Sequence, residues 1–227
     1  MVKYRDYYIA FLDILGFSDL VNTEKAEVIH SVFSRIKQAE ILTTKYPVTE
    51  NQIGILQKNT KFLFFSDTIV CAIPCDLAGA FEMVTSNCML IQHALFSSKT
   101  PILLRGAIVK GKLFIDGNEM FGPGLIEAYR LEESLAKYPR IIMTCKTYED
   151  GIAASNDNEE IIYISHTNDG LIEVEIFKYL DEANQARLHD LIISKIATEI
   201  DVRVREKYLW LKDHYNSFTK EKSGDSP

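Results

Sequence analysis

The sequence predicts an α+β domain with a central, antiparallel-rich sheet, and three observations lead to that prediction. Residues 7–15 form a short apolar run typical of a buried strand, and residues 23–42 then show the spacing of an amphipathic helix. Residues 61–74 contain two apolar segments around a polar turn, and a second helical stretch and another strand follow. The order strand, helix, strand, strand, helix, strand is the ferredoxin-like arrangement, in which we expect the helices on one face.

The first half of the chain supplies the first helix and the central hairpin. The strand at residues 7–15 (YYIAFLDIL) is apolar, aromatic and β-branched, and Gly16 ends it. Residues 45–60 are polar and contain Pro47 and Gly54, so we expect a loop there. In the helix at 23–42, apolar residues recur at helical spacing at Val28, Ile29, Val32, Phe33 and Ile36.

The remaining elements of the predicted domain alternate in the same way. Residues 66–68 (Ser-Asp-Thr) form the turn of the hairpin at 61–74, and a helix runs from residue 75 to about 96. The later elements are expected as strands at 102–109 and 112–115 around Gly111, a helix at 125–136, a strand at 140–144, a solvated loop at 153–160 and a hairpin of 161–164 with 171–179.

The C-terminal segment differs from the rest, because residues 181–218 read as one long helical stretch. Its apolar residues recur every four positions, and it ends in an aromatic cluster. We expect this stretch to pack on the core or on a partner subunit. The residues concerned are Leu188, Ile192, Ile196 and Ile200 in the stripe and Tyr208, Trp210 and Tyr215 in the cluster.

Composition narrows the functional classes. The 227 residues carry a formal net charge of -7, with a pI near 5.3, whereas proteins that bind duplex nucleic acid usually present a basic surface. No leader stretch and no apolar run near the roughly 18 residues of a membrane span is found, so we expect a cytoplasmic protein without membrane or nucleic-acid partners. The cysteines, expected as reduced core residues, are Cys71, Cys75, Cys88 and Cys145.

Two carboxylates lie where apolar residues would be expected. Asp13 lies inside the first strand, and Asp67 lies at the tip of an apolar hairpin. In a ferredoxin-like sheet these segments are neighbours, so the two carboxylates can converge on one point. Such a pair suits two hard divalent cations, Mg²⁺ or Mn²⁺, which clamp the oxygens of a phosphoryl transfer. The alternative is that Asp13 pairs with an arginine and Asp67 is a plain turn residue.

The segment that follows Asp13 passes directly from strand to helix. Residues 14–18 (ILGFS) should therefore present backbone N–H groups that could hold a triphosphate. Lysine side chains near this point are further candidates for contact with the triphosphate, with a solvated strand end as the simpler alternative for each. These lysines are Lys61, Lys110 and Lys112.

Four ordered motifs resemble those of class III adenylyl and guanylyl cyclases. The first resembles the family's opening motif, the second its second metal aspartate, the third its next strand, and the fourth its dimer-spanning catalytic segment. The motifs are residues 11–18 (FLDILGFS), 65–67 (FSD), 105–111 (RGAIVKG) and 119–132 (EMFGPGLIEAYRLE), and the similarity covers residues 6–180.

This resemblance implies a head-to-tail homodimer with two shared sites. Asp13, Asp67 and the carbonyl of Ile14 would hold two metal ions, and Arg130 would arrive from the other subunit. The 3′-hydroxyl would then attack the α-phosphate and release diphosphate. Contacts to the nucleotide are expected from Leu15, Gly16 and Phe17. The alternative for Arg130 is an ion pair on its own helix, with Glu127 or Glu133. Residues 1–180 would form the class III catalytic domain and residues 181–227 a C-terminal helical extension.

Three positions depart from the purine cyclases. The residue four before the second metal aspartate is Leu63 rather than lysine or glutamate, and the other purine-reading position is Glu119. The transition-state asparagine is replaced by Ile126. Loss of such a donor costs on the order of 10²- to 10³-fold in rate unless another group replaces it. The sequence is therefore not that of a standard purine cyclase.

Several motifs, with a terminal KYLWLKDHYN at residues 207–216, more closely resemble the pyrimidine cyclases of bacterial anti-phage (Pycsar) systems. That resemblance implies conversion of UTP or CTP into a cyclic monophosphate that acts on a separate effector protein. Apolar Leu63 is consistent with a smaller base, and Glu119 would accept from the amine of cytosine or be a solvated turn residue. The other hypotheses are a purine cyclase with altered base contacts and an inactive nucleotide sensor; a diguanylate cyclase is disfavoured because the chain has no GGDEF or GGEEF.

Overall fold

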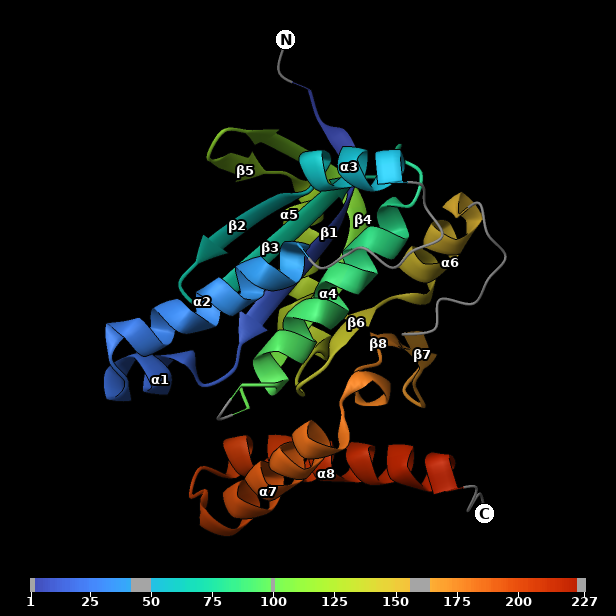
Figure 1. Ribbon diagram of the computed structural model, residues 1–227. Coiled ribbons are helices and arrows are strands. Elements are labelled where there is room, and N and C mark those ends of the chain that lie inside the picture. The colour runs from blue at the N-terminus through green and yellow to red at the C-terminus, as the bar shows by residue number, and fades with distance from the viewer. Residues whose placement is uncertain (1–2, 42–49, 99–100, 156–163, 224–227) are drawn as a thin grey trace.

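The computed structural model describes residues 3–41, 50–98, 101–155 and 164–223. Its sheet has the strand order β2-β3-β1-β4-β6-β8-β7, with β5 paired to β4 (Figure 1). The first four strands in this order are those of a ferredoxin-like sheet, with β1 between β3 and β4. The α+β prediction with a C-terminal helix is therefore confirmed.

The central strand β1 (Arg5–Ile14) is antiparallel to both neighbours. It pairs with β3 (Thr68–Pro74) from Tyr7 to Asp13 and with β4 (Leu104–Asp116) along its whole length. Strand β2 (Lys61–Phe65) completes the hairpin with β3. This register makes Asp13 directly opposite Thr68 on one side and Arg105 on the other.

Alternate residues of β1 point to two different layers of helix. One set, which includes Tyr8 and Leu12, belongs to the large core under α2 (Ala26–Ile41) and α4 (Ala80–Phe96). The other set, which includes Tyr7 and Ile9, packs under α5 (Pro123–Leu135) on the opposite face. The expectation of helices on one face only is therefore corrected by α5, whose crossover joins the parallel strands β4 and β6.

Several elements differ in extent from the prediction. The helix predicted at residues 23–42 is present as α2, and an unpredicted short helix, α1 (Phe17–Thr23), precedes it. The second predicted helix, α4, begins at Ala80 rather than at residue 75. The loop expected at residues 45–60 contains a helix, α3 (Glu50–Asn59). The two strands expected around Gly111 are one strand, β4, which forms a hairpin with β5 (Glu119–Phe121).

The edge of the sheet beyond β4 is built from short elements. Strand β6 (Ile141–Met143) leads into a helix that the sequence reading did not include, α6 (Cys145–Ala154), whose first turn is capped by the side chain of Thr144. The predicted final hairpin is present as β7 (Ile164–His166) and β8 (Ile172–Val174). The start of that hairpin and most of the loop expected at 153–160 lie outside the described residues. Cys145 is exposed, which corrects the expectation that all four cysteines are core residues.

After a short 3₁₀ turn at Phe177–Tyr179, the chain ends in two helices rather than one, α7 (Glu182–Thr198) and α8 (Val202–Ser223). Both lie beneath the lower end of the sheet in Figure 1. Leu188 and Ile192 of the predicted stripe are buried, but Ile200 is 90% exposed because it lies in the break between the helices. Of the helices in the described part of the chain, none is both long and apolar enough to cross a bilayer.

Candidate functional site

The two predicted carboxylates come from neighbouring strands at one end of the sheet. Asp13 is the second-last residue of β1, and Asp67 is in the turn that joins β2 to β3. Asp13 is opposite Thr68 in the ladder, and the N–H of Ile14 donates to the carbonyl oxygen of Asp67 at 3.0 Å. Both side chains are partly exposed. The topology therefore brings the two aspartates together as the sequence predicted.

Asp13 is bound by an arginine of the neighbouring strand. The Nε of Arg105 on β4 donates to Asp13 Oδ2 at 2.8 Å and lies 2.8 Å from Oε1 of Glu132 on α5. The alternative reading of Asp13, a pairing with an arginine, is therefore present in the structure. Within the described residues Oδ1 of Asp13 takes part in no hydrogen bond. One carboxylate oxygen thus stays open to a cation, which is compatible with a metal site.

Glu132 is the most buried acid of this group, with 4% of its side chain exposed. Burial raises the pKa of Glu132, and the nearby charge of Arg105 only partly offsets that effect. The charge of Asp13 raises the pKa further. Arg105 therefore supplies the positive charge that offsets the repulsion between Asp13 and Glu132, in the layer between the sheet and α5.

The backbone after Asp13 is only partly open to a ligand. The N–H of Ile14 is bonded to Asp67, and the N–H of Leu15 donates to the carbonyl of Leu103 at 3.0 Å. The free N–H groups expected over residues 14–18 therefore begin at Gly16. Gly16 is exposed with a φ of 74°, a left-handed conformation that glycine adopts at little cost. Phe17 is buried and contacts Phe33 edge-on, so its side chain is a core residue.

Arg130 lies on the outer face of α5, away from its own Asp13. Glu132 faces Arg105, and residues two apart on a helix are about 200° apart around its axis. Arg130 is exposed and, among the residues that the structure describes, forms an ion pair neither with Glu127 nor with Glu133. The same-helix ion pairs considered for Arg130 are therefore absent from this structure.

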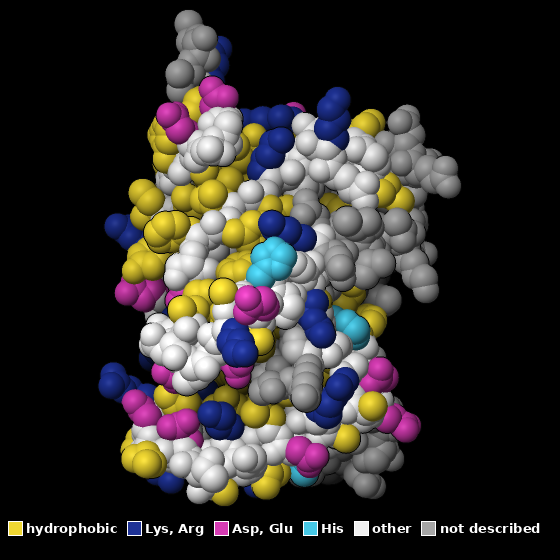
Figure 2. Space-filling view, turned by 60° about the vertical axis from the view of Figure 1, so that its left-hand side comes forward, with side chains coloured by type: hydrophobic (Ala, Val, Ile, Leu, Met, Phe, Trp, Pro, Cys, Tyr) yellow, Lys and Arg dark blue, Asp and Glu magenta, His cyan; other side chains and the backbone are white. Residues whose placement is uncertain are grey.

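The outer face of α5 contains an open hollow of about 600 Å³. Ile126, at the position of the family's transition-state asparagine, is 53% exposed in its wall. Hydrophobic side chains also gather over the upper part of the face drawn in Figure 2, towards the β2 and β5 edge. The hollow is lined by Pro123, Ile126, Glu127, Arg130, Leu131 and Ser134.

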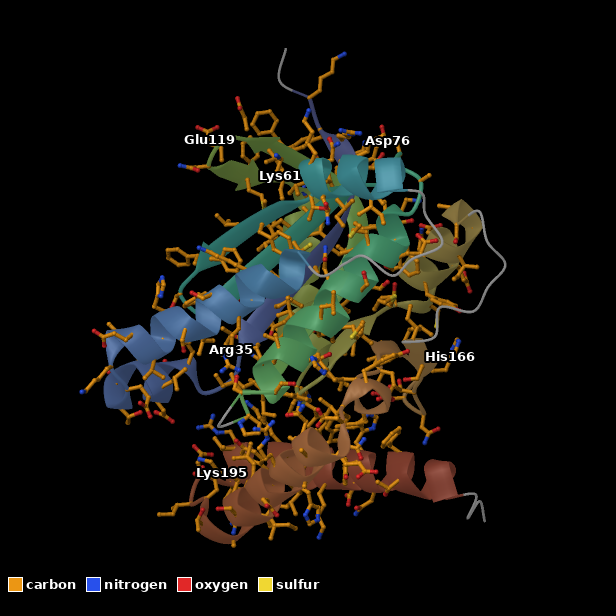
Figure 3. All side chains as sticks on the ribbon, viewed as in Figure 1. Arg35, Lys61, Asp76, Glu119, His166 and Lys195 are labelled. Carbon is orange, nitrogen blue, oxygen red and sulfur yellow. The ribbon has the colours of Figure 1, made fainter. Side chains whose placement is uncertain are left out.

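The two positions expected to read the base lie far apart in one subunit. Leu63 on β2 is half-buried in the cluster beneath α5, on the face of the sheet that carries Asp13. Glu119 is opposite Asp116 in the β4–β5 hairpin. Through the strand pairing Leu63 is level with Ala107 of β4, and Asp116 is nine positions further along that strand, which corresponds to about 30 Å. Figure 3 shows Glu119 at the end of the molecule opposite Lys195 of α7.

The three lysines expected near the site lie towards the other end of the sheet. Lys110 is opposite Tyr8 and Lys112 is opposite Asp6, five and seven positions before Asp13. Lys61 begins β2, at the end away from Asp67. The register therefore corrects the view that these lysines surround the aspartates of their own subunit.

Two basic residues that the sequence reading did not assign are closer to the aspartates. One is Arg105, described above. The other is Lys207 of α8, whose pKa is lowered by burial and by Arg105, while the charges of Asp13, Asp201 and Glu132 act in the opposite direction. Arg105 could be found from the register of β1 and β4. Lys207 gives no local signal, because its position depends on how α8 docks.

A second cluster of titratable groups fixes α8 to the sheet. The Nε2 of His214 lies 2.7 Å from Oε1 of buried Glu173 on β8, and Nη1 of Arg140 lies 3.7 Å from Oε2 of Glu173. Glu173, Glu175 and His214 offer ligand atoms within 4.8 Å of one another, so they could hold a metal ion. Because Arg140 and His214 already place positive groups beside Glu173, we interpret this cluster as an electrostatic clamp between α8 and the sheet.

The fold is that of class III cyclase catalytic domains. The guanylyl cyclase domain of the RhoGC fusion protein from the aquatic fungus Blastocladiella emersonii superposes with a TM-score of 0.50 at 15% identity, covering 76% of this chain and 96% of that one. The catalytic core of a rhodopsin–guanylyl cyclase with converted specificity, in complex with ATPαS, gives 0.51 at 12% identity, covering 78% and 99%. No family model and no curated protein matches the sequence.

Proposed function

We propose that this chain is a metal-dependent nucleotidyl cyclase that converts a pyrimidine nucleoside triphosphate, UTP or CTP, into its 3′,5′-cyclic monophosphate and diphosphate. The observation that carries the proposal is the convergence of Asp13 and Asp67 at one end of a sheet with the class III cyclase fold. Convergent carboxylates at that point suit a phosphoryl transfer between two metal-bound oxygens.

The residues at this end of the sheet fit two hard divalent cations, Mg²⁺ or Mn²⁺. Asp13 and Asp67 supply carboxylate oxygens, and the carbonyl oxygen of Ile14 is the third ligand that the family resemblance assigns. When bound, these ions would stabilise charge on the attacking and leaving oxygens. Oδ1 of Asp13 remains for a cation while Arg105 keeps Oδ2.

The protein's own part in the reaction is to bind, orient and neutralise charge. Residues from Gly16 onwards offer the loop for the triphosphate, and Arg130 supplies a cation for the negative charge that develops at the α-phosphate. Because Arg130 is directed away from its own Asp13, the proposal requires a homodimer in which each site combines Asp13 and Asp67 of one subunit with Arg130 of the other.

The choice of base is proposed from two residues. Leu63 replaces a polar base-reading residue, and its half-buried apolar environment suits a pyrimidine, which presents a smaller ring. Glu119 would accept a hydrogen bond from the amine of cytosine if the partner subunit brings it to the site; without that contact UTP is favoured. By the same resemblance, the cyclic product would be a second messenger in anti-phage defence that acts on a separate effector in the cytoplasm.

One observation favours a second candidate, an inactive cyclase fold that only senses a nucleotide. Ile126, 53% exposed on the outer face of α5, cannot donate the hydrogen bond that the family's asparagine donates at this position. Retention of Asp13, Asp67 and Arg130 favours the enzyme. A purine cyclase with altered base contacts would keep the same mechanism and change only the base.

The deciding experiment is incubation of the purified protein with each of the four NTPs and Mn²⁺, followed by chromatography with mass detection. We expect one pyrimidine triphosphate to give a 3′,5′-cyclic monophosphate and diphosphate. A purine product would overturn the base assignment alone. A folded dimer that binds NTP and gives no product from any of the four would favour the nucleotide sensor.

A further inference from the structure

The C-terminal helix α8 carries one inward stripe that runs along the catalytic body. Trp210 stacks on Tyr138 with ring centroids 4.8 Å apart, Leu211 is buried, and His214 contacts Glu173. These three residues follow Lys207 at positions i+3, i+4 and i+7, which share one face of a helix. Lys207 therefore continues the inward stripe by one turn, so its side chain is directed towards the body of the protein rather than towards solvent.

This end of α8 adjoins the strand ends that carry the candidate site. Tyr208, next to Lys207, packs in the same apolar cluster as Leu15 and Leu103. Leu15 is two residues after Asp13, Leu103 is two before Arg105, and the two leucines are joined by a backbone hydrogen bond. The docking of α8 thus brings a cation to the group formed by Asp13, Arg105 and Glu132. Figures 1 and 3 show α8 beneath this end of the sheet.

The ammonium group of Lys207 has no direct partner among the described residues. It is half-buried, and within the described part of the chain it forms no hydrogen bond and no ion pair within 4.0 Å. A partly desolvated cation without a partner is held at a cost, which a bound anion would remove. Asp13 and Glu132 do not lie within ion-pair distance of Lys207, and both already contact Arg105.

We propose that Lys207 is a further substrate-binding residue, which contacts the polyphosphate tail of the nucleoside triphosphate bound at Asp13 and Asp67. The proposal rests on the proposed function and extends it to a residue outside the catalytic domain's own sheet and helices. With cations on Oδ1 of Asp13 and Arg105 on Oδ2, Lys207 would face a strongly anionic ligand beside these groups. The C-terminal extension would then serve catalysis directly, by completing the phosphate-binding side of the site.

The test measures binding of inorganic tripolyphosphate with Mn²⁺ by calorimetry, because this probe has neither base nor sugar and does not react by cyclisation. We expect Lys207→Met to weaken binding about tenfold or more, as loss of a charge-assisted hydrogen bond would, and Lys207→Arg to retain most of the affinity. Lys212→Met is the matched control, since Lys212 lies on the same helix about 140° away around its axis. In the cyclase assay, Lys207→Met should raise KM and weaken inhibition by diphosphate.

The outcomes separate this proposal from the proposed function. Equal affinity of Lys207→Met, Lys212→Met and unsubstituted protein for tripolyphosphate would overturn the role of Lys207, whether or not the protein is a cyclase. Selective loss in Lys207→Met would support the role even if no NTP were cyclised, in which case only the proposed function fails. If Lys207→Met did not fold, Lys207→Gln would replace it. Absence of any tripolyphosphate binding by the unsubstituted protein would overturn the role as well.

Discussion

At the scale of single residues, the candidate site is a set of carboxylates that outnumber their partners. Arg105 serves both Asp13 and Glu132, and Asp67 has no ion pair within the described residues. Clustered carboxylates of this kind repel each other unless a cation neutralises them. Divalent ions bound at Asp13 and Asp67 would relieve that repulsion, so metal binding and folding should support each other here.

The first prediction concerns Asp67. Asp67→Asn should reduce product formation to background while the dimer stays folded, because the turn keeps a side chain of the same shape and loses only the charged metal ligand. Mn²⁺ affinity, measured by electron paramagnetic resonance, should fall in parallel. Asp116→Asn, at the turn of the β4–β5 hairpin, is the control and should leave both quantities unchanged. Undiminished turnover in Asp67→Asn would refute the metal assignment.

The second prediction concerns Arg105 and Glu132. Arg105→Met should lower the free energy of unfolding by about 2–3 kcal/mol, because it leaves buried Glu132 without its cation. Adding Glu132→Gln to Arg105→Met should recover part of that loss, since the uncompensated charge is then removed. Urea unfolding of the two single variants and the double variant measures the effect. A double variant less stable than Arg105→Met alone would contradict this account.

Single residues of the site could be predicted to different degrees. Asp13 and Asp67 stand out because each is a charged residue inside an apolar run, a signal that is local. Arg105 required the strand register, and Lys207 required the docking of α8, so neither was assigned. Lys61, Lys110 and Lys112 were misplaced because their distance from Asp13 depends on which ends of the strands meet.

At the scale of elements, the position of α5 depends on an unusually close approach to the sheet. A Cβ on Gly124 would lie 2.7 Å from Cδ1 of Ile9 and 2.8 Å from the carbonyl carbon of Gly111. Two glycines therefore let the first turn of α5 contact the backbone of β4. The same helix carries Arg130 outwards and Glu132 inwards, so its distance from the sheet sets the geometry of the site.

The third prediction tests this approach. Gly124→Ala should destabilise the fold by about 1–3 kcal/mol through overpacking and should also lower activity, since α5 must move outwards. Gly54→Ala is the matched control, because its Cβ would meet nothing within 4 Å in helix α3. That control should gain about 0.5–1 kcal/mol from better helix propensity. Thermal unfolding compares the two, and equal effects would refute the packing argument.

The fourth prediction uses the clamp between α8 and β8. Burial lowers the pKa of His214, but its hydrogen bond to Glu173 and the charges of Glu173 and Glu175 prevail over burial and over Arg140, so the pKa rises above 6.5. The stabilisation by protonated His214 is therefore fully present below about pH 6.5 and is lost as the pH rises through the raised pKa of His214. The unfolding temperature, measured from about pH 6 to 9, should fall less steeply with pH in His214→Gln than in the unsubstituted protein.

The control for this pH dependence is His189→Gln. His189 lies on α7, where its Nδ1 is 3.9 Å from Asp190, and both of these side chains are largely exposed. This variant should keep the pH profile of the unsubstituted protein. If His214→Gln and His189→Gln gave the same profile, the clamp would not be the origin of the pH dependence.

Elements with strong periodicity were predictable and polar ones were not. Strand β1, the hairpin of β2 and β3, and helices α4 and α5 follow from runs of apolar residues at clear spacing. Helix α3 was missed because Gly54 and polar neighbours resemble a loop, although its own Leu56 is buried. Helix α6 was missed because it is short, although Thr144 is a recognisable N-cap. The break between α7 and α8 has no glycine or proline to mark it.

At the scale of the whole molecule, the two faces of the sheet are unequally covered. Helices α2 and α4 cover one face, whereas among the described helices only α5 covers the other, and it exposes apolar residues such as Ile126 on its outer side. Ile126, in the wall of the hollow on α5, is 53% exposed, and Phe121 and Tyr129, near it in the sequence, are exposed as well. Exposed apolar side chains beside a hollow are typical of an interface. A second copy seated on this face would bury it and bring Arg130 to the partner's Asp13.

The ferredoxin-like order of this molecule follows from its periodic segments, but the proposed dimer does not, because an interface depends on side chains from distant elements. The fifth prediction tests that dimer. Arg130→Ala and Asp13→Ala should each be inactive alone, and mixing them should restore activity, since a mixed dimer has one site with both Asp13 and Arg130 intact. Random exchange of equal amounts makes half of the dimers mixed with one working site each, so about a quarter of the unsubstituted activity should return.

The complementation experiment needs a control that distinguishes residues on the same side of a site from residues that two subunits contribute, and it needs proof that subunits exchange. Mixing Asp13→Ala with Asp67→Ala should restore nothing, because both residues belong to the same side of every site and each mixed dimer lacks one of them at each site. Light scattering should give the mass of a dimer for all variants. If Arg130→Ala with Asp13→Ala recovered nothing while exchange was demonstrated, Arg130 would not act across the interface. Arg130 would then be a solvent-exposed residue of α5 with no part in the partner's site.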